Sequence, residues 1–431
     1  MGMRRKVYEG TCINHKGGVG EIGSMINHSV FQKGTVGDTL INHDLKDGAP
    51  TSDSVLQFDC TDEDLARMLG LYSYIIRALV IGGKRSIFQI LEELKEALFW
   101  QMDHFNRIGI EYPEEVVIDG CDFSLASHPD LKDVKLSTFF FGPEAQKVRP
   151  DQKRFDAVQF FNNKNNVIRL AKSLGVRVPP TLLFSSVDEV GDCADFVYPS
   201  TIKMGNSVSG LGLEKCYSRE HLEKVLRRVP VGKDFQMQKF LENLVPFSIQ
   251  WWADESGPVP ITGTCNFIEG NANHAGNWSS PDIPHRALIK FTLLLAVIAW
   301  MMGIRDWFSF DVGLYDNGSP NFYLLECNPR YTGAAYPFIA ASKLLGGIKE
   351  AREYFWASKT YKSSMNSINK LDLGELEFGF KGNPKSGKRE GWISVNPGPL
   401  SVGDGKISMM YVGNPANYRK SEDKLKNLLD S

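Results

Sequence analysis

The stretch YLLECNPRYTGAAYP, residues 323–337, puts an acid, an amide and an arginine at the end of an apolar run. Side chains on a β-strand alternate between its two faces. Leu325 and Cys327 would then project to one side of the strand, and Pro329, which has no N–H for a central ladder, should end it. Three polar side chains would face the other way: Glu326, Asn328 and Arg330.

The residues before this stretch predict that it is the second strand of a hairpin. The segment WFSFDVGLYDNGSPNFYLLECN contains two β-runs joined by the turn-rich sequence DNGSP. If Asp316 pairs with Asn321, the register places Asp311 directly opposite Glu326. Two carboxylates and the Asn328 amide would then share one face, at a cross-strand distance of roughly 5 Å.

Like charges at that distance are costly unless a cation lies between them. A hard divalent cation, Mg²⁺ or Mn²⁺, with oxygen ligands is one natural occupant. The alternative is a salt-bridged hairpin in which Arg330 neutralises Glu326. The hairpin alone leaves both interpretations open.

Length and composition narrow the class of protein. With 431 residues the chain should form two or three domains, and its formal net charge of −2 argues against a nucleic-acid-binding surface. The seven cysteines are scattered without any C-x-x-C, so neither a disulfide framework nor a zinc site is indicated. Reduced thiols in a cytosolic protein are the simplest account.

Two segments bear on membranes. The start, MGMRRKVYEGTC, lacks the apolar stretch of a signal peptide. The apolar run FTLLLAVIAWMMGI, residues 291–304, is too short to span a bilayer, so we expect a buried helix. A cytoplasmic, soluble protein without a membrane partner is the expectation.

The first 60 residues are glycine-rich and carry INH three times, at 13–15, 26–28 and 41–43. A histidine metal site is one interpretation, but the spacings match no ligand motif, and chance or a small turn repeat is the alternative. The segment GGVGEIG, residues 17–23, lacks the strand–loop–helix context and the downstream acid of a phosphate-binding loop.

Residues 62–80 and 86–105 show helical periodicity, and EEVVID at 114–119 reads as a strand. The region 1–150 therefore predicts an α/β unit whose function the sequence does not reveal.

From residue 151 the pattern becomes specific. A helix is expected at 163–174 with a stop at Gly175, and residues 198–226 predict strand, loop, strand and helix. Lys203 lies at the end of the first of these strands. Backbone N–H groups of small residues can approach a phosphate closely, although a plain structural turn would have the same composition. The small residues of this loop are Gly205, Ser207, Ser209, Gly210 and Gly212.

The next segment, KDFQMQKFLENLVPFSIQWWAD, predicts a strand with Gln236 and Gln238 on one face, a short break and a second strand. Such a break exposes backbone donors and acceptors that suit the edge of an adenine ring.

In this order the pieces resemble an ATP-grasp ligase over about residues 155–345. The resemblance implies an α/β and α+β fold in which two lobes clamp ATP, preceded by an N-terminal α/β domain. It also implies ATP and Mg²⁺ (or Mn²⁺) as cofactors. The E-x-N-P-R-x-x-G motif is the most specific element. The resemblance assigns the phosphate lysines Lys164 and Lys203, the phosphate loop Gly205, Ser207, Ser209, Gly210 and Gly212, the adenine hinge Gln238, Lys239, Phe240 and Leu241, the metal ligands Asp311, Glu326 and Asn328, and the catalytic residues Arg330 and Lys203.

The chain departs from the family pattern at several positions. Gln238 stands where the hinge usually has a glutamate, and Glu242 is the only candidate for the ribose-binding acid. Ser309 occupies a position where some members have an arginine, which leaves Arg330 for the reacting carboxylate. The segment HAGNWSSPDIP, residues 274–284, resembles the one beside the acceptor substrate, without a diagnostic residue.

The resemblance implies an enzyme that forms C–N bonds and releases ADP, joining small carboxylate and amine substrates such as amino acids or peptides. The NPRYTG ending favours amino-acid and peptide ligases, and GNSVSGLG lacks the consecutive glycines of biotin carboxylases. A carboxylase-type enzyme acting through carboxyphosphate is the alternative. A nucleotide-binding protein without catalysis is disfavoured because the acid, amide and arginine set is complete. A homodimer is a general expectation.

Four parts are expected: an N-terminal domain at 1–150, two ATP-grasp lobes at 151–230 and 231–345, and a β-rich closing segment at 346–431.

Overall fold

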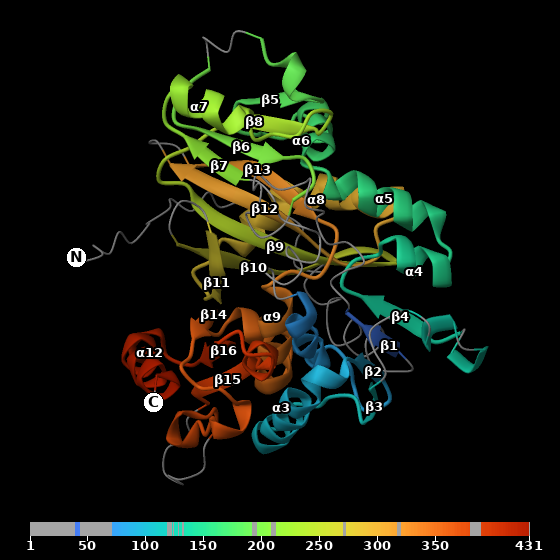
Figure 1. The fold of residues 1–431 in the computed structure, drawn as a ribbon, viewed down its shortest axis with the longest axis vertical. Coiled ribbons are helices and arrows are strands. Elements are labelled where there is room, and N and C mark those ends of the chain that lie inside the picture. The colour runs from blue at the N-terminus through green and yellow to red at the C-terminus, as the bar shows by residue number, and fades with distance from the viewer. Residues whose placement is uncertain are drawn as a thin grey trace, which may run out of the picture.

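A computed structural model gives the architecture of the chain. It describes residues 39–43, 71–118, 123, 125–127, 129–131, 133–191, 196–207, 213–269, 273–316, 320–379 and 389–430. Three sheets organise these residues: a small sheet at one end, an eight-stranded sheet that runs from the middle to the other end, and a parallel sheet at that second end (Figure 1).

The N-terminal sheet is parallel, with the strand order β3-β2-β1-β4. Its strands are β1 (Thr39–Asn42), β2 (Ile87–Ile90), β3 (Glu115–Ile118) and β4 (Lys135–Thr138). Its helical segments are η3 (Leu71–Val80), η4 (Glu92–Leu94), α3 (Lys95–Ile108), η5 (Leu125–Ser127) and η6 (Pro129–Leu131). The α/β character predicted for this region is confirmed.

The helix predicted at 86–105 is wrong at its start. Residues Ile87–Ile90 form β2, between β1 and β3, and the α-helix begins only at Lys95. A short apolar run buried on both faces of a parallel sheet has no alternating pattern, so its sequence does not distinguish it from a helix. The strand predicted at 114–119 is confirmed as β3.

Three helices lead from this domain to the small sheet: α4 (Pro143–Val148), α5 (Gln152–Asn162) and α6 (Lys164–Ser173). The Asn163 side chain caps α6 by accepting the Asn166 N–H at 3.0 Å. Gly175 follows the helix with φ 69°, as the predicted stop requires. The helix expected at 163–174 is confirmed.

The small sheet is antiparallel, with the order β5-β8-β6-β7. Its strands are β5 (Thr181–Phe184), β6 (Ser200–Met204), β7 (Leu213–Cys216) and β8 (Phe235–Lys239), with η7 (Val187–Glu189) and α7 (Arg219–Leu226) beside them. The first lobe predicted at 151–230 ends one strand short of this sheet, because β8 pairs with both β5 and β6.

The large sheet has the order β13-β12-β9-β10-β11-β14-β16-β15. Its strands are β9 (Val245–Asp254), β10 (Gly257–Glu269), β11 (Asn273–Ser279), β12 (Asp306–Asp316), β13 (Pro320–Asn328), β14 (Trp356–Lys362), β15 (Gly391–Asn396) and β16 (Lys406–Val412). The accompanying helices are α8 (His285–Met302), α9 (Ala335–Leu345), α10 (Ile348–Arg352), η8 (Ile368–Lys370), η9 (Gly374–Leu376), α11 (Gly398–Ser401) and α12 (Pro415–Leu429).

The β-rich C-terminal segment continues the large sheet, because β14 pairs with β11. At this junction a Cβ on Gly276 would lie 2.0 Å from the Ser358 carbonyl oxygen, and the backbone there has φ 150°. Only glycine fits so close an approach of two strands. The four-part division of the chain therefore stays a proposal, with its last two parts sharing one sheet.

Among the described residues, α8 is the one helix long and apolar enough to pass a test for a membrane span. It packs against β9 and β10, with Leu288, Leu295 and Ala299 buried. Only 28% of the 18 residues of this helix are buried. The prediction of a buried helix therefore holds for one of its faces alone. Its outer face exposes Leu293, Leu294 and Met301.

A buried ionic network ties the N-terminal domain to the large sheet. Asp306, the first residue of β12, pairs with Lys135 of β4 at 2.7 Å and with Arg154 of α5 at 2.8 Å. Burial alone would raise the pKa of Asp306, but the two cations outweigh it and lower the pKa. His43, directly after β1, lies with its ring centroid 4.8 Å from that of Tyr331, so the carboxyl end of β1 is near the residues that follow β13.

Candidate functional site

The acid pair predicted on the β12–β13 hairpin is present. Asp311 lies directly opposite Glu326, and Ser248 of β9 flanks Asp311 on its other side. At the turn end of the hairpin the pairing differs from the prediction, because Asp316 pairs with Pro320 rather than with Asn321. A register shift between Asp311 and Val312 restores the predicted pairing.

The register shift is a β-bulge at Leu325, since Val312 pairs with Leu324 and Asp311 with Glu326. The core below the sheet consequently takes Leu324 and Cys327. The expectation that Leu325 shares the face of Cys327 is wrong, because a bulge adds one residue and resets the alternation. Cys327 is a packing residue, as predicted, and is 4% exposed.

The two carboxyl groups differ electrostatically. Burial, the charge of Glu326 and a hydrogen bond to it raise the pKa of Asp311. Burial would also raise the pKa of Glu326, but Lys164, Lys203 and Arg330 lower it below its usual range. These environments favour the protonated form of Asp311 and the ionised form of Glu326.

The amide and the arginine of the motif extend this network. Asn328 donates from Nδ2 to Asp311 Oδ2 at 3.1 Å. Arg330 donates to Asn328 Oδ1 at 2.7 Å and to Asn162 Oδ1 at 2.7 Å. Glu326 forms an ion pair with Lys164. Among the described residues, no ion pair joins Glu326 to Arg330. The salt-bridged alternative, in which Arg330 neutralises Glu326 directly, is therefore not the arrangement seen.

Lysines reach the acid pair from two elements of the small lobe. Lys164, the first residue of α6, forms an ion pair with Glu326 at 3.3 Å and donates to the Ser207 carbonyl at 2.9 Å. Lys203 of β6 donates to Gln238 Oε1 at 2.7 Å. Burial lowers the pKa of Lys203 to about 8, while the charges of Glu326 and Asp311 act in the opposite direction. Both lysines thus face the cleft between the two sheets.

Only part of the predicted phosphate loop can be placed. Gly205 and Ser207 follow β6, whereas Ser209, Gly210 and Gly212 lie outside the described residues. Gly205 is held between two elements, since its N–H donates to the Asp234 carbonyl at 2.9 Å and its carbonyl accepts the Lys164 N–H at 2.8 Å. A Cβ on Gly205 would lie 2.3 Å from the Asp234 carboxylate oxygens.

Replacing Gly205 with alanine should destabilise the small lobe by about 1–3 kcal/mol, the usual cost of overpacking. The Asp234 carboxylate cannot withdraw without giving up its 2.8 Å hydrogen bond from Asn163. The free energy of unfolding in urea measures the effect.

Gly191→Ala is the matched control, because a Cβ there meets no atom within 4 Å. Equal stability of the two variants would contradict the packing role assigned to Gly205.

The predicted hinge joins the two lobes between β8 and β9. The Lys239 and Phe240 N–H groups donate to the carbonyl oxygens of Pro180 and Pro199, at 2.8 and 2.9 Å. The Lys215 ammonium lies 3.6 Å from the centroid of the Phe240 ring. Gln238 belongs to the β8 ladder, so Leu241 is the hinge residue whose N–H lies outside both the ladder and these proline contacts.

Two buried polar side chains along this cleft lack partners in the described part of the chain. Both amide atoms of Gln236 are unsatisfied, although the residue is fully buried on β8 opposite Lys203. Ser309 Oγ, on β12 beside Asn328, is also unsatisfied. Such atoms are costly to leave unpaired, so these positions suit a polar ligand.

Sequence reasoning missed several residues that support the site. Asn162 holds Arg330, Ser248 hydrogen-bonds Asp311, and Asp234 packs on Gly205. His274, in the segment thought to border the acceptor substrate, approaches the loop after β13, since a Cβ on Gly333 would lie 3.3 Å from His274 Cε1. The sequence does not indicate the roles of Asn162, Ser248 and Asp234, because each is far along the chain from the residue that it contacts.

Other candidates from the sequence do not join the site. The INH copies at 13–15 and 26–28, the segment 17–23, and the first part of the helix predicted at 62–80 lie outside the described residues. In the third INH copy, Asn42 and His43 end β1 and are buried. In the part of the chain that is described, no three His, Cys, Asp or Glu side chains form a metal-binding group.

The donor set at the hairpin fits a hard divalent cation. It offers two carboxylates and an amide oxygen on adjacent strands, the ligand types that Mg²⁺ prefers. Asp311 and Glu326 lie opposite each other, so a cation held by both would relieve the repulsion of the two carboxylates. The side chain of Glu326 is 28% exposed, so its oxygens reach the cleft.

Comparisons with known proteins agree with this architecture. No protein-family model matches the chain. It is 27% identical over 246 residues to the carbamoyl phosphate synthase large chain of Xylella fastidiosa, which covers 54% of this chain and 21% of that protein. The chain thus spans about a fifth of the length of this curated relative.

Solved structures match nearly the whole chain. The N5-carboxyaminoimidazole synthetase of Staphylococcus aureus complexed with ADP superposes with a TM-score of 0.53 at 11% identity, over 91% of this chain and 97% of that one. The L-amino acid ligase of Bacillus licheniformis superposes with a TM-score of 0.50 at 14% identity, over 90% and 97%. These similarities show that the chain has the ATP-grasp fold.

Proposed function

We propose that the protein is an ATP-dependent ligase that activates a carboxylate as an acyl phosphate and joins it to an amine, releasing ADP and phosphate. One observation carries the proposal: Lys164 touches the Ser207 carbonyl of the phosphate loop and the Glu326 carboxylate at once. A single side chain thereby joins the loop, helix α6 and the acid pair in one cleft. The ADP complex of the related synthetase gives independent support.

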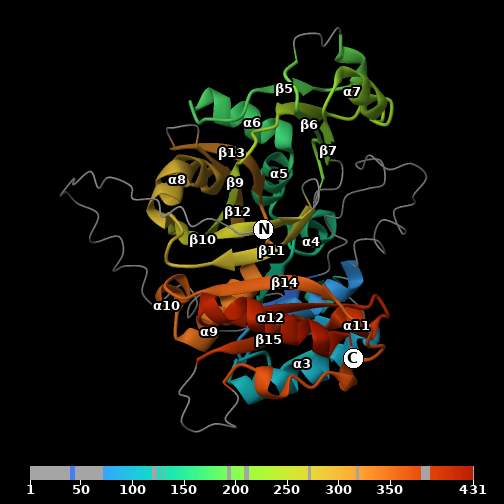
Figure 2. The same cartoon turned by 90° about the vertical axis from the view of Figure 1, so that its left-hand side faces the viewer.

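The parts of the cleft suggest how ATP would be bound. The Leu241 N–H would meet the adenine edge, and the unpaired Gln236 amide lies on β8, the strand that leads into the hinge. Lys164 and Lys203 would hold phosphate oxygens, and the backbone at Gly205 and Ser207 would approach them. The small sheet lies against the β12–β13 end of the large sheet in both views (Figures 1 and 2), so a nucleotide would be enclosed between the lobes.

Asp311, Glu326 and Asn328 would hold Mg²⁺, which supplies charge neutralisation on the β- and γ-phosphates. Cation binding requires Asp311 to lose its proton, so the site should load more readily as the pH rises. Arg330, held by Asn162 and Asn328, would orient the carboxylate with its planar fork of donors.

A carboxylate does not react directly with an amine, because its oxygen is a poor leaving group, and phosphorylation corrects this. A carboxylate oxygen attacks the γ-phosphorus, and the bond from that phosphorus to the bridging oxygen breaks, so ADP leaves. The amine then attacks the acyl carbon, phosphate departs, and the nitrogen loses a proton. Positioning and electrostatic stabilisation are the protein's main contributions to such a transfer.

A second candidate is a reaction through carboxyphosphate, in which bicarbonate takes the place of the organic acid. The sequence similarity to a carbamoyl phosphate synthase favours it. The structural similarity to an L-amino acid ligase favours the first candidate. Small-molecule substrates and no macromolecular partner are proposed in either case, and a homodimer in the cytoplasm remains part of the proposal.

Purified protein incubated with Mg-ATP, hydroxylamine and a panel of amino acids and small carboxylic acids tests the proposal. We expect ADP release and hydroxamate formation to depend on a particular acid, because hydroxylamine intercepts an acyl phosphate. Reactions without acid or without ATP are the controls.

ADP release stimulated by bicarbonate alone would favour the second candidate. ADP release by neither bicarbonate nor any acid would contradict the proposed function.

A further inference from the structure

Arg77 is a cation of the N-terminal region that is surrounded by aromatic rings. It lies on η3, is half-buried, and its guanidinium carbon is 4.5, 5.0 and 5.4 Å from the ring centroids of Tyr336, Tyr74 and Phe139. It also hydrogen-bonds the Tyr336 hydroxyl. In the part of the chain that the structure describes, no carboxylate forms an ion pair with Arg77. Aromatic rings hold its plane but leave its charge and most of its donors available.

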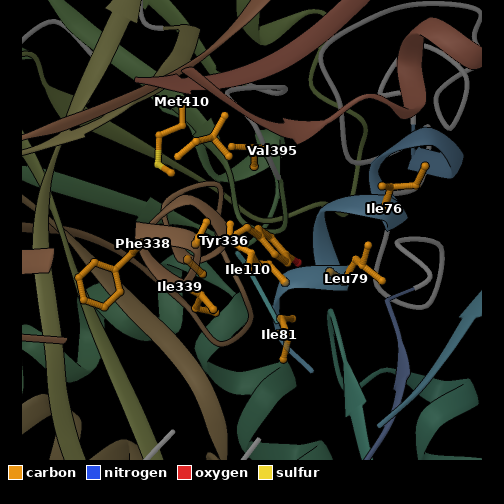
Figure 3. Close-up of a cluster of buried hydrophobic side chains, with 14 of the residues drawn as sticks. Ile76, Leu79, Ile81, Ile110, Tyr336, Phe338, Ile339, Val395 and Met410 are labelled. Atoms are coloured by element: carbon orange, nitrogen blue, oxygen red, sulfur yellow. The ribbon is translucent and has the colours of Figure 1, made fainter. Parts of the chain in front are cut away.

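Tyr336 connects Arg77 to the proposed active site. It is fully buried at the start of α9, six residues after Arg330. Figure 3 shows its hydroxyl end pointing toward η3, the helix that carries Ile76 and Leu79. Burial raises the pKa of Tyr336 to about 12, and the charges of Arg77 and Arg330 both act against that rise. The charges of both guanidinium groups thus act on one tyrosine.

The carboxyl ends of two neighbouring parallel strands lie near Arg77, since its guanidinium contacts Phe139 and the Tyr336 ring that His43 also contacts. His43 directly follows β1, and Phe139 directly follows β4. The order β3-β2-β1-β4 changes direction between these two strands. In open parallel sheets, ligands bind outside the carboxyl ends at such a switch point.

Among the described residues at these strand ends, no group balances the charge of Arg77. His43 contacts the Tyr336 hydroxyl at 3.1 Å and Ser137 Oγ at 3.1 Å, and burial, reinforced by Arg77, lowers its pKa to about 3. It is therefore neutral at physiological pH. Asp306 already has two cations of its own, Lys135 and Arg154. Among the described residues, Arg77 thus has no ion-pair partner, whereas Arg330 lies in the field of Glu326 and Asp311.

We propose that an organic substrate of this ligase carries a second anionic group, a carboxylate or a phosphate, beside the carboxylate that reacts, and that Arg77 binds it at the carboxyl ends of β1 and β4. The inference rests on the proposed function for its reacting group. Arg330 would hold the reacting end, and Arg77 would select against acids that have only one charge. Bicarbonate lacks such a second group, so this arrangement also favours the acyl-phosphate reaction.

Binding to the MgADP-loaded protein tests this inference without turnover. Calorimetric titration would compare the diacids malonate, succinate, glutarate and adipate with the monoacids of equal carbon number, and 3-phosphonopropionate would represent a phosphate-type second group. We expect at least one doubly anionic probe to bind about tenfold or more tightly than its monoacid, as for one added charged hydrogen bond. Whether the preferred probe is a dicarboxylate or the phosphonate distinguishes the two sources of charge.

Arg77→Met should abolish this preference, and Arg77→Lys should keep part of it, because lysine retains the charge without the fork. Arg85→Met is the matched control, an exposed arginine of the same domain just before the amino end of β2. Unfolding in urea verifies that each variant is folded.

Equal binding of diacids and monoacids by the wild type would overturn the inference, as would an unchanged preference in both Arg77 variants. Failure of the ligase function is distinct, because it would appear as absent hydroxamate and ADP release while the binding preference persists.

Discussion

Replacing Glu326 with glutamine should lower ATP turnover by roughly a thousandfold, because a lost carboxylate ligand removes several kcal/mol of metal-assisted stabilisation. Glutamine keeps the shape of the side chain but not its charge, so Lys164 loses its 3.3 Å ion-pair partner. Asp311 would also lose the neighbour whose charge raises its pKa. The measurement is steady-state ADP release over a range of Mg²⁺ concentrations.

The fold should survive this change, since Glu326 faces the cleft rather than the core. Glu375→Gln is the matched control, because that carboxylate is exposed and pairs only with Lys424 on the surface. An active, normally folded Glu326→Gln protein would remove Glu326 from the proposed metal site.

Replacing Arg330 with methionine should suppress hydroxamate formation by about a hundredfold or more, the usual effect of losing one group that stabilises developing charge. Methionine retains the apolar stem of arginine but cannot orient a carboxylate. Because Arg330 contacts Asn162 and Asn328 rather than the two lysines, binding of MgADP should change little. Hydroxamate yield and calorimetric binding of MgADP separate these two effects.

Arg177→Met is the corresponding control. Arg177 is an exposed arginine that donates to Asn321, away from the cleft. Retention of hydroxamate formation in Arg330→Met, or an equal loss in Arg177→Met, would contradict the role proposed for Arg330.

The sequence allowed the hairpin and its acid pair to be predicted, because turn residues, alternation and Pro329 all act locally. It did not allow the bulge at Leu325 to be predicted, since a bulge depends on how neighbouring strands pack. The strand Ile87–Ile90 was taken for helix because burial on both faces removes the alternating pattern. Local patterns thus identified elements, while their tertiary surroundings decided the details.

The supporting residues of the site show the same limit. Asn162 contacts Arg330 across 168 positions, and Asn163 reaches Asp234 across 71. Arg77 and Tyr336 come from different domains, and only the docking of η3 against α9 brings them together. No spacing rule links such residues, so the fold was needed to find them.

The central claim, that a carboxylate is activated by phosphorylation, is tested most directly by oxygen transfer. The acid identified with hydroxylamine would be supplied with ¹⁸O in its carboxylate, together with Mg-ATP and the amine, and the mass of the released phosphate measured. The account predicts one ¹⁸O atom in the phosphate for each amide formed, with ADP as the nucleotide product. Phosphate without ¹⁸O, or AMP as the product, would contradict it.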